Sequence, residues 1–360
     1  MGEINLKREY PCMEINLNKI THNVKEISNI CSTKGIHIVG VSKVFCAREA
    51  IVNAMLEGGI EIIGDSRIEN LKHLKEIKCK KLLLRIPMKS TAAEVVKYSD
   101  ISLNSEYQTI VCLSKAAKRV NKIHNIILMV DLGDLREGVL EKDVPILVED
   151  ILKLPNINLC GIGTNLTCYG GVIPDKDNLG RLVELKESLN SKFGITLPIV
   201  SGGNSSSLYA VIDGSIPDGI TQLRIGEGIV LGRETAYGNP IPNCYNDSFV
   251  LKGEIVEIKE KPSIPSGKIG MDAFGETPHF EDKGIIKRAI IALGRQDITP
   301  EGLIPTDNCI EILGASSDHL IINISNCNNK YDIGDIITFN IDYGCMLRAM
   351  TSPYVKKYYV

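Results

Sequence analysis

Short apolar runs alternate with amphipathic segments over residues 36–228. Eight runs are predicted as strands, over residues 36–43, 61–66, 80–86, 100–106, 125–133, 158–166, 198–205 and 221–228. Most are continuously apolar, which is typical of strands buried on both faces of a parallel sheet. Eight such strands with helices between them predict an α/β fold, a (β/α)₈ barrel of the TIM type. A doubly wound open sheet is the alternative, but its Gly-rich dinucleotide fingerprint is absent.

The clearest helix is predicted over residues 178–193, where apolar side chains form one stripe. Asp177 is a candidate N-cap, and Gly194 follows the last apolar position.

The pattern changes after residue 235. A Gly-, Pro- and Asn-rich linker is followed by strand-like runs without long helical spacers, over residues 249–259, 286–294, 309–314, 318–324 and 335–342. We therefore predict a barrel over residues 1–235 and an all-β domain over 236–360. A strand at 13–17 and a helix at 19–31 precede the first barrel strand and could begin either domain.

Composition narrows the class of protein. Apolar residues make up 44% and charged residues 24% of the 360 positions, as in a globular chain. The net charge of −3 carries no basic footprint, so neither nucleic acid nor a membrane surface is expected as a partner. The N-terminus lacks an apolar leader, which predicts a cytoplasmic protein. The eleven cysteines include no C-x-x-C pair, so free thiols, no disulfide framework and no metal site are expected.

In a (β/α)₈ barrel the chemistry lies at the carboxyl ends of the strands. The first strand ends with Lys43. Two interpretations stay open: a solvated lysine at the rim, or a partly desolvated lysine whose free amine forms a Schiff base.

Glycine and serine gather after the seventh and eighth strands, in SGGNSSSL (201–208) and LRIGEG (223–228). Paired glycines allow close approach of a ligand, and phosphate sites recur after these two strands. Together with Lys43, these turns predict a pyridoxal phosphate site whose aldehyde bonds the lysine and whose phosphate rests on Ser205 and Gly226.

These residues resemble a known family. The matching stretches are VGVSKVFC (39–46), GDSRIENL (64–71), MVDLGDLREG (129–138), GIGTNLTCYGG (161–171), SGGNSSSL (201–208), LRIGEGIVLGRE (223–234), IIALGRQD (290–297), GASSDHL (314–320) and MTSPYV (350–355). In order and spacing they are similar to the alanine/ornithine racemase family of fold-type III pyridoxal-phosphate enzymes, and most of all to its ornithine racemase branch. The resemblance covers nearly the whole chain.

The resemblance implies roles around the cofactor ring. Lys43 corresponds to the Schiff-base lysine and one catalytic base, and Arg224 to an arginine against the pyridine nitrogen. A guanidinium stays protonated, so it would leave the ring a weaker electron sink. Arg136 corresponds to an arginine near the phenolic oxygen, and Asn165 replaces a histidine that lies beside the ring.

The resemblance also implies phosphate contacts. Ser205, Gly226 and Tyr354 match the family's phosphate-binding positions. Asn204 and Glu227 lie in the same two motifs and are counted among the cofactor-binding residues.

One position departs from the family. Racemisation needs a second acid/base on the opposite face of Cα, where alanine racemases use a tyrosine, and here that position is Arg295. Arginine is a poor proton shuttle. Asp297, Asp318, a tyrosine elsewhere or water could serve instead. Arg295 and Asp318 could also bind the substrate, and both aspartates could merely cap loops.

The resemblance therefore predicts an amino-acid racemase that abstracts the Cα proton from an external aldimine. Ornithine is the favoured substrate. Alanine or lysine are alternative substrates, and a non-catalytic pyridoxal-phosphate homeostasis protein is the alternative class, although those proteins lack a second domain. A decarboxylase is disfavoured because its motifs are missing. A basic substrate would need an acidic partner, for which Glu227, Asp297 and Asp318 are candidates. The family further implies a homodimer with shared active sites.

Overall fold

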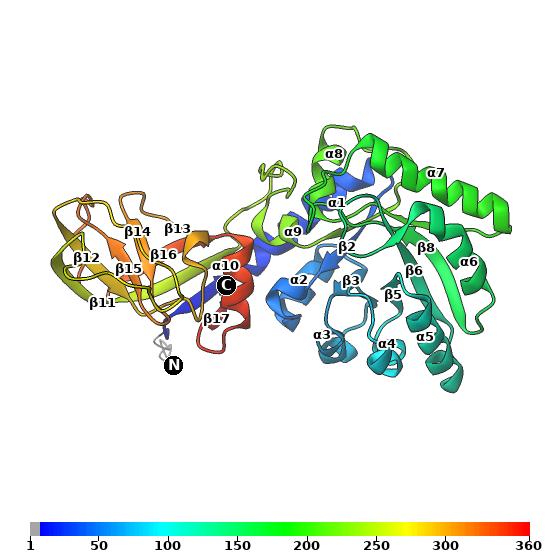
Figure 1. The fold of residues 1–360 in the computed structure, drawn as a ribbon, viewed down its shortest axis with the longest axis horizontal. Coiled ribbons are helices and arrows are strands. Elements are labelled where there is room, and N and C mark those ends of the chain that lie inside the picture. Colours follow the sequence, from blue (N-terminus) through cyan, green and yellow to red (C-terminus); the bar gives the residue numbers. More distant parts are fainter. Residues whose placement is uncertain (1–7) are drawn as a thin grey trace, which may run out of the picture. The chain divides into compact units, whose positions relative to one another are not determined.

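The computed structural model describes residues 8–360 and divides them into two compact units (Figure 1). One unit is Leu17–Asn246, and the other combines residues 8–16 with Asp247–Val360. None of the helices within residues 8–360 is long and apolar enough to span a bilayer.

The first unit is a closed parallel barrel. Its strands are β2 (His37–Val41), β3 (Ile62–Asp65), β4 (Lys80–Leu83), β5 (Ile101–Asn104), β6 (His124–Asp131), β8 (Ile157–Gly163), β9 (Ile199–Ser201) and β10 (Gln222–Ile225). Each pairs in parallel with the next, and β10 pairs back onto β2. The short β7 (Val139–Leu140) adds to β6. All eight predicted strands are present, so the barrel prediction is confirmed.

Helices surround this barrel (Figure 1). They are α1 (Leu17–Ser32), α2 (Glu49–Glu57), α3 (Ile68–His73), α4 (Ala92–Tyr98), α5 (Tyr107–Arg119), α6 (Val144–Leu152), α7 (Lys176–Phe193), α8 (Leu208–Ile212) and α9 (Glu227–Leu231). Helix α7 begins two residues before its predicted start because Asp175, not Asp177, is its N-cap. The Asp175 carboxylate and the Asn178 side chain form a reciprocal capping box, and Gly194 ends the helix at φ 63°.

The strands of the barrel share an apolar cluster. Alternate residues of neighbouring strands pack together there, namely Val39, Leu82, Ile101, Leu103, Ile127 and Met129. Because side chains alternate along a strand, this leaves the intervening positions to pack outside the barrel.

The second unit is built on an antiparallel sheet. Its strands are β1 (Cys12–Ile15), β11 (Phe249–Pro262), β12 (Ile285–Ile291), β13 (Leu303–Pro305), β14 (Glu311–Ala315), β15 (Leu320–Asn323), β16 (Ile336–Ile341) and β17 (Lys356–Tyr359). Only β1 and β17 pair in parallel. One helix, α10 (Tyr343–Thr351), was not predicted, and Asp342 caps it by accepting from the Cys345 N–H at 2.7 Å. The prediction of an all-β domain therefore missed a helix.

The units meet along the chain at Asn16/Leu17 and Asn246/Asp247, whereas the sequence placed the boundary after residue 235. Strand β1 belongs with the second unit because it pairs with Phe249–Lys252 of β11. The linker up to Asn246 belongs with the barrel because the buried Asn23 amide of α1 binds the backbone of Tyr245 in both directions, at 2.7 and 2.8 Å.

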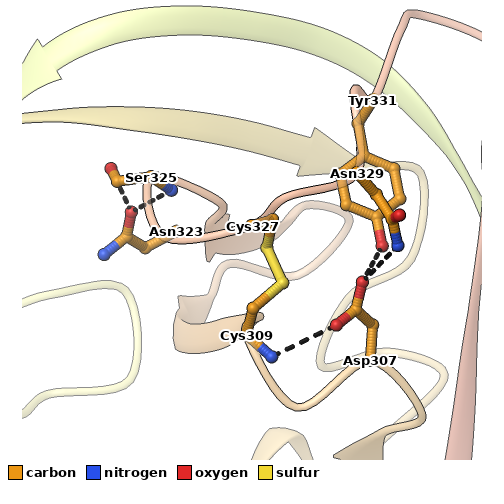
Figure 2. The surroundings of a disulfide bond; sticks show 7 residues. All are labelled: Asp307, Cys309, Asn323, Ser325, Cys327, Asn329 and Tyr331. Atoms are coloured by element: carbon orange, nitrogen blue, oxygen red, sulfur yellow. Dashed lines mark hydrogen bonds between the residues drawn. A yellow bond between two sulfur atoms is a disulfide. The ribbon is translucent and has the colours of Figure 1, made fainter.

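Two cysteines of the second unit form a disulfide, Cys309–Cys327 (Figure 2). The expectation that all eleven thiols are free was wrong here. The two residues flank the β14–β15 pair, whose antiparallel pairing brings its outer ends together. Asp307 lies beside the disulfide and accepts hydrogen bonds from Asn329 and Tyr331.

His124, in β6, makes a buried polar contact with Ser102 of the neighbouring strand β5. Its Nε2 lies 2.9 Å from Ser102 Oγ, and burial lowers its pKa to about 4. The imidazole is therefore neutral in the folded protein at neutral pH.

We expect the free energy of unfolding to fall as the pH drops from about 6.5 to about 4, by about 3 kcal/mol. In this window the unfolded chain binds a proton at His124 that the folded protein does not. Urea unfolding at pH 7.0, 5.5 and 4.5 measures the effect, and His124→Asn should remove this part of it. His37→Asn, at an exposed position in β2, is the control. An identical pH dependence in the wild type and His124→Asn would contradict the assignment.

Candidate active site in the barrel unit

Lys43 begins the 3₁₀ helix η1 (Lys43–Phe45), directly after β2, with its side chain exposed. The residue before it is fixed: the Ser42 hydroxyl donates at 2.7 Å to the buried carboxylate of Asp65, at the end of β3. Burial raises the pKa of Asp65, while the hydrogen bond from Ser42 acts in the opposite direction. The carboxyl ends of β2 and β3 are thereby joined beneath Lys43.

Arg224, in β10, is buried, with 4% of its surface exposed. Its guanidinium donates to Ser201 Oγ, to the Thr164 carbonyl at 2.7 Å and to Asn165 Oδ1 at 3.3 Å. All three acceptors are neutral, and burial lowers the pKa of Arg224 to about 10. The side chain therefore carries a positive charge at neutral pH that these protein contacts orient but do not neutralise.

Asn165 and Asn204 join the ends of β8 and β9. Asn204 Nδ2 donates to Asn165 Oδ1 at 3.2 Å and to the Leu166 carbonyl at 2.9 Å. The Asn165 Nδ2 atom is buried and has no hydrogen-bond partner in the protein. A buried amide donor without a partner is costly, so this atom is a candidate contact for a bound group.

The turns after β9 and β10 are held together by Ser205, whose Oγ accepts the Gly228 N–H at 3.1 Å. Gly226 lies beside the end of β2: a Cβ at this position would come within 3.1 Å of Val41 Cβ. The backbone at residue 226 therefore closely approaches the strand that carries Lys43. The two glycine turns and the lysine are brought to the same end of the barrel, as predicted.

Arg136 lies in the loop between β6 and β7, where the carboxylate of Glu137 accepts from both its Nε and one of its terminal nitrogens. The Arg136 side chain is 40% exposed, and the Glu137 side chain is 18% exposed. Both act electrostatically on Arg224, so the loop lies near the buried guanidinium.

Glu227 begins α9, and Arg233 donates to its Oε1 at 2.8 Å. This carboxylate is engaged within the barrel unit.

The remaining candidate residues lie in the second unit. Arg295 donates to Glu301 at 2.9 Å and to the Ala315 carbonyl at 3.2 Å, and its guanidinium carbon lies 5.1 Å from the Phe274 ring centroid. The Arg348 side chain in turn donates to the Arg295 carbonyl at 2.7 Å. Arg295 is thus held in a defined orientation.

Asp297 is buried and accepts from the Ser352 hydroxyl, whose oxygen in turn accepts the Tyr354 N–H at 3.0 Å. The carboxylate therefore organises the segment that carries Tyr354, whose own side chain is 58% exposed. Asp318 lies in the turn after β14, exposed, and accepts from Ser317 at 3.0 Å.

The sequence reasoning missed two carboxylates of the β6–β7 loop, Asp134 and Glu137. The signal was present, because both flank Arg136 in the stretch MVDLGDLREG. A carboxylate in a polar loop resembles a solvated surface charge, so its partners were visible only in the folded chain.

The chain is similar to known proteins over most of its length. The family model described as alanine racemase, N-terminal domain, matches residues 15–234. An ornithine racemase from Acetoanaerobium sticklandii is 53% identical over 349 residues, covering 97% of this chain and 99% of the relative. A lysine racemase from Thermotoga maritima is 43% identical over 353 residues, covering 97% of this chain and 98% of the relative.

The fold is also shared with solved structures. Alanine racemase from Bartonella henselae with covalently bound pyridoxal phosphate superposes with a TM-score of 0.74 at 16% identity, over 98% of this chain and 100% of that one. The solved structure shares the fold, and the two racemases are similar to this chain over nearly its full length. The chain belongs to the alanine racemase family, as its motifs indicate.

Proposed function

We propose that this chain, an amino-acid racemase by family, interconverts L- and D-ornithine with pyridoxal phosphate as its cofactor. The observation that carries the proposal is the buried Arg224 guanidinium, hydrogen-bonded to Asn165, at the barrel end where Lys43 lies. The choice of ornithine is supported by the 53% identity to the ornithine racemase.

The residues present fit the cofactor. The unpartnered Asn165 amide needs an acceptor, and Lys43 offers an amine for a Schiff base. The lack of a side chain at Gly226 lets its backbone lie close to Val41, at the end of the strand that precedes Lys43. We propose that Ser205 and Gly226 hold the phosphate, together with Tyr354, and that Asn204 and Glu227 support the same turns. Arg136 would lie near the phenolic oxygen of the ring, and Arg224 against its pyridine nitrogen.

When bound, pyridoxal phosphate withdraws electrons from an attached amino acid and so acidifies its Cα–H. We propose that the Lys43 amine removes or returns the proton on one face of Cα. Arg224 donates hydrogen bonds from a guanidinium that stays charged, so it orients its acceptor and moves no proton.

The second face of Cα needs another acid/base, and we propose that it comes from the group of Arg295, Asp297 and Asp318. Asp297 already accepts a hydrogen bond from Ser352, and Arg295 is engaged with Glu301. Asp318 is exposed, which makes it the best suited of the three to meet a substrate. Charge-neutral substitution of Glu227, Asp297 and Asp318 tests whether an acidic group sets the preference for ornithine over alanine.

Proton NMR with L-ornithine and pyridoxal phosphate in D₂O, followed by chiral analysis, tests the function. We expect loss of the Cα–H signal and appearance of D-ornithine, faster than the same exchange with lysine or alanine. No exchange with any of the three, despite bound cofactor, would favour the non-catalytic pyridoxal-phosphate protein. Faster turnover of lysine would overturn the choice of substrate, since a lysine racemase is also similar.

We further propose a cytoplasmic homodimer with shared active sites, as the family resemblance implies. Activity per subunit should then fall on dilution into the range where dimers dissociate, and bound cofactor should be lost more slowly. Sedimentation and activity measured over the same concentrations test this. A stable monomer with full activity would contradict it.

A further inference from the structure

In the loop between β6 and β7, the Arg136 guanidinium is hydrogen-bonded to the carboxylate of the next residue, Glu137. Both oxygens of Glu137 accept from Arg136, one from Nε and one from a terminal nitrogen. This two-point fork defines the plane of the guanidinium, which a single contact does not. Glu137 is the less exposed partner, with 18% of its side chain exposed against 40% for Arg136.

Asp134 holds the loop itself in place. Its carboxylate, 1% exposed, accepts the backbone N–H groups of Cys168, Tyr169 and Val172 at 3.0 to 3.3 Å, from the loop after β8. In return the Asp134 carbonyl accepts the Gly170 N–H at 3.1 Å, and a Cβ on Gly170 would lie 2.8 Å from that carbonyl oxygen. The loop that carries the Arg136–Glu137 pair is therefore tied through Asp134 to the loop after β8.

Two guanidinium groups, Arg136 and Arg224, are close enough to influence each other. Burial is the largest influence on the pKa of Arg224 and lowers it. Among the weaker influences, the charge of Glu137 raises this pKa and the charge of Arg136 lowers it. Without Glu137 the positive charge of Arg136 would act unopposed on the buried guanidinium of Arg224. The carboxylate offsets one of these two charges.

We propose that Glu137 is a positioning residue of the cofactor site, which fixes the guanidinium plane of Arg136 and offsets its charge so that Arg136 and Arg224 can bind one ligand together. This inference rests on the proposed function, since Arg136 is placed at the cofactor by that proposal. Glu137 itself is neither acid nor base in the reaction.

Glu137→Gln is the direct test because it keeps the shape, removes the charge and offers one acceptor where the fork needs two. We expect kcat/KM for ornithine to fall about tenfold, as for losses of residues that orient a ligand-binding group. We also expect faster release of cofactor from the holoenzyme and a shifted visible absorption maximum of the bound cofactor. A merely structural carboxylate would not move that maximum.

Glu187→Gln is the matched control. Glu187 also pairs with the basic residue before it, Lys186, at 2.7 Å, but on α7 and with 63% of its side chain exposed. We expect no change in activity, cofactor release or absorption.

A double-mutant cycle tests whether Glu137 acts through Arg136. Once Arg136→Gln has removed the guanidinium, adding Glu137→Gln should cost less than about a further twofold. If Glu137→Gln does not fold, Arg136→Lys replaces it, because lysine keeps the charge and loses the fork; the same shift in absorption is then expected.

Additive effects in the cycle, or a Glu137→Gln protein that behaves like Glu187→Gln, would overturn the inference. Cofactor release and the absorption maximum are measured without turnover. A wild-type protein that binds cofactor and does not racemise would therefore defeat the proposed function, while these two readouts still decide the role of Glu137.

Discussion

Lys43→Ala should lower racemisation by about 10³-fold or more, the scale of loss seen when a covalent catalytic side chain is removed. The proposal makes Lys43 both the anchor of the cofactor and the base on one face of Cα, and alanine can perform neither task. The Cα–H exchange of L-ornithine in D₂O measures the activity, and the visible absorption of the protein measures attachment of the cofactor.

Lys89→Ala is the control for this prediction. Lys89 is another exposed lysine that begins a 3₁₀ helix, η3 (Lys89–Thr91), in the same unit. Its substitution should leave activity and absorption unchanged. If Lys43→Ala kept both, the Schiff base would have to form on a different lysine, and the assignment of the site would fail.

Arg224→Met should lower racemisation by about 10²-fold, as for loss of an oriented donor at a reacting group. The same substitution should change the free energy of unfolding by less than about 2 kcal/mol. Methionine removes the cost of burying a charge, and this offsets the hydrogen bonds lost by the Thr164 carbonyl and Asn165 Oδ1. We infer that Arg224 is present for its charge at the site more than for stability.

Urea unfolding at equal cofactor loading, beside the exchange assay, separates the two effects. Arg181→Met is the control, because Arg181 is half-exposed and pairs with Glu141 at 3.1 Å on the outside of the unit. A large loss of stability with unchanged activity in Arg224→Met would mean that the arginine is structural.

The order of the barrel strands was accessible from the sequence because burial on both faces leaves a continuous apolar run. Lys43 was found by the same logic, since a charged residue at the end of such a run stands out against its surroundings, whereas Arg224 was identified only through the family resemblance. The boundaries of the elements were less accessible. The sequence pattern does not distinguish Asp175 from Asp177 as the cap of α7, because the choice depends on which carboxylate meets the Asn178 N–H.

Contacts between residues distant in the chain could not be predicted in this way. The sequence contained Glu137 beside Arg136, but adjacent residues on a chain need not face each other. Similarly, β1 joined the second unit through pairing with β11, about 240 positions away, and Cys309 met Cys327 because β14 and β15 are antiparallel.

The sequence by itself determined that this protein contains a (β/α)₈ barrel and that it belongs with the racemases, and it predicted a site where Lys43 and the two glycine turns end their strands. These properties depend on local periodicity and on motifs, and both can be recognised in short stretches of consecutive residues. Only the tertiary structure decided the neutral hydrogen-bond acceptors of Arg224, the unpartnered amide of Asn165 and the two-point contact of Arg136 with Glu137. Burial and hydrogen bonding depend on which loops meet at the end of the barrel, and that is set when the strands close.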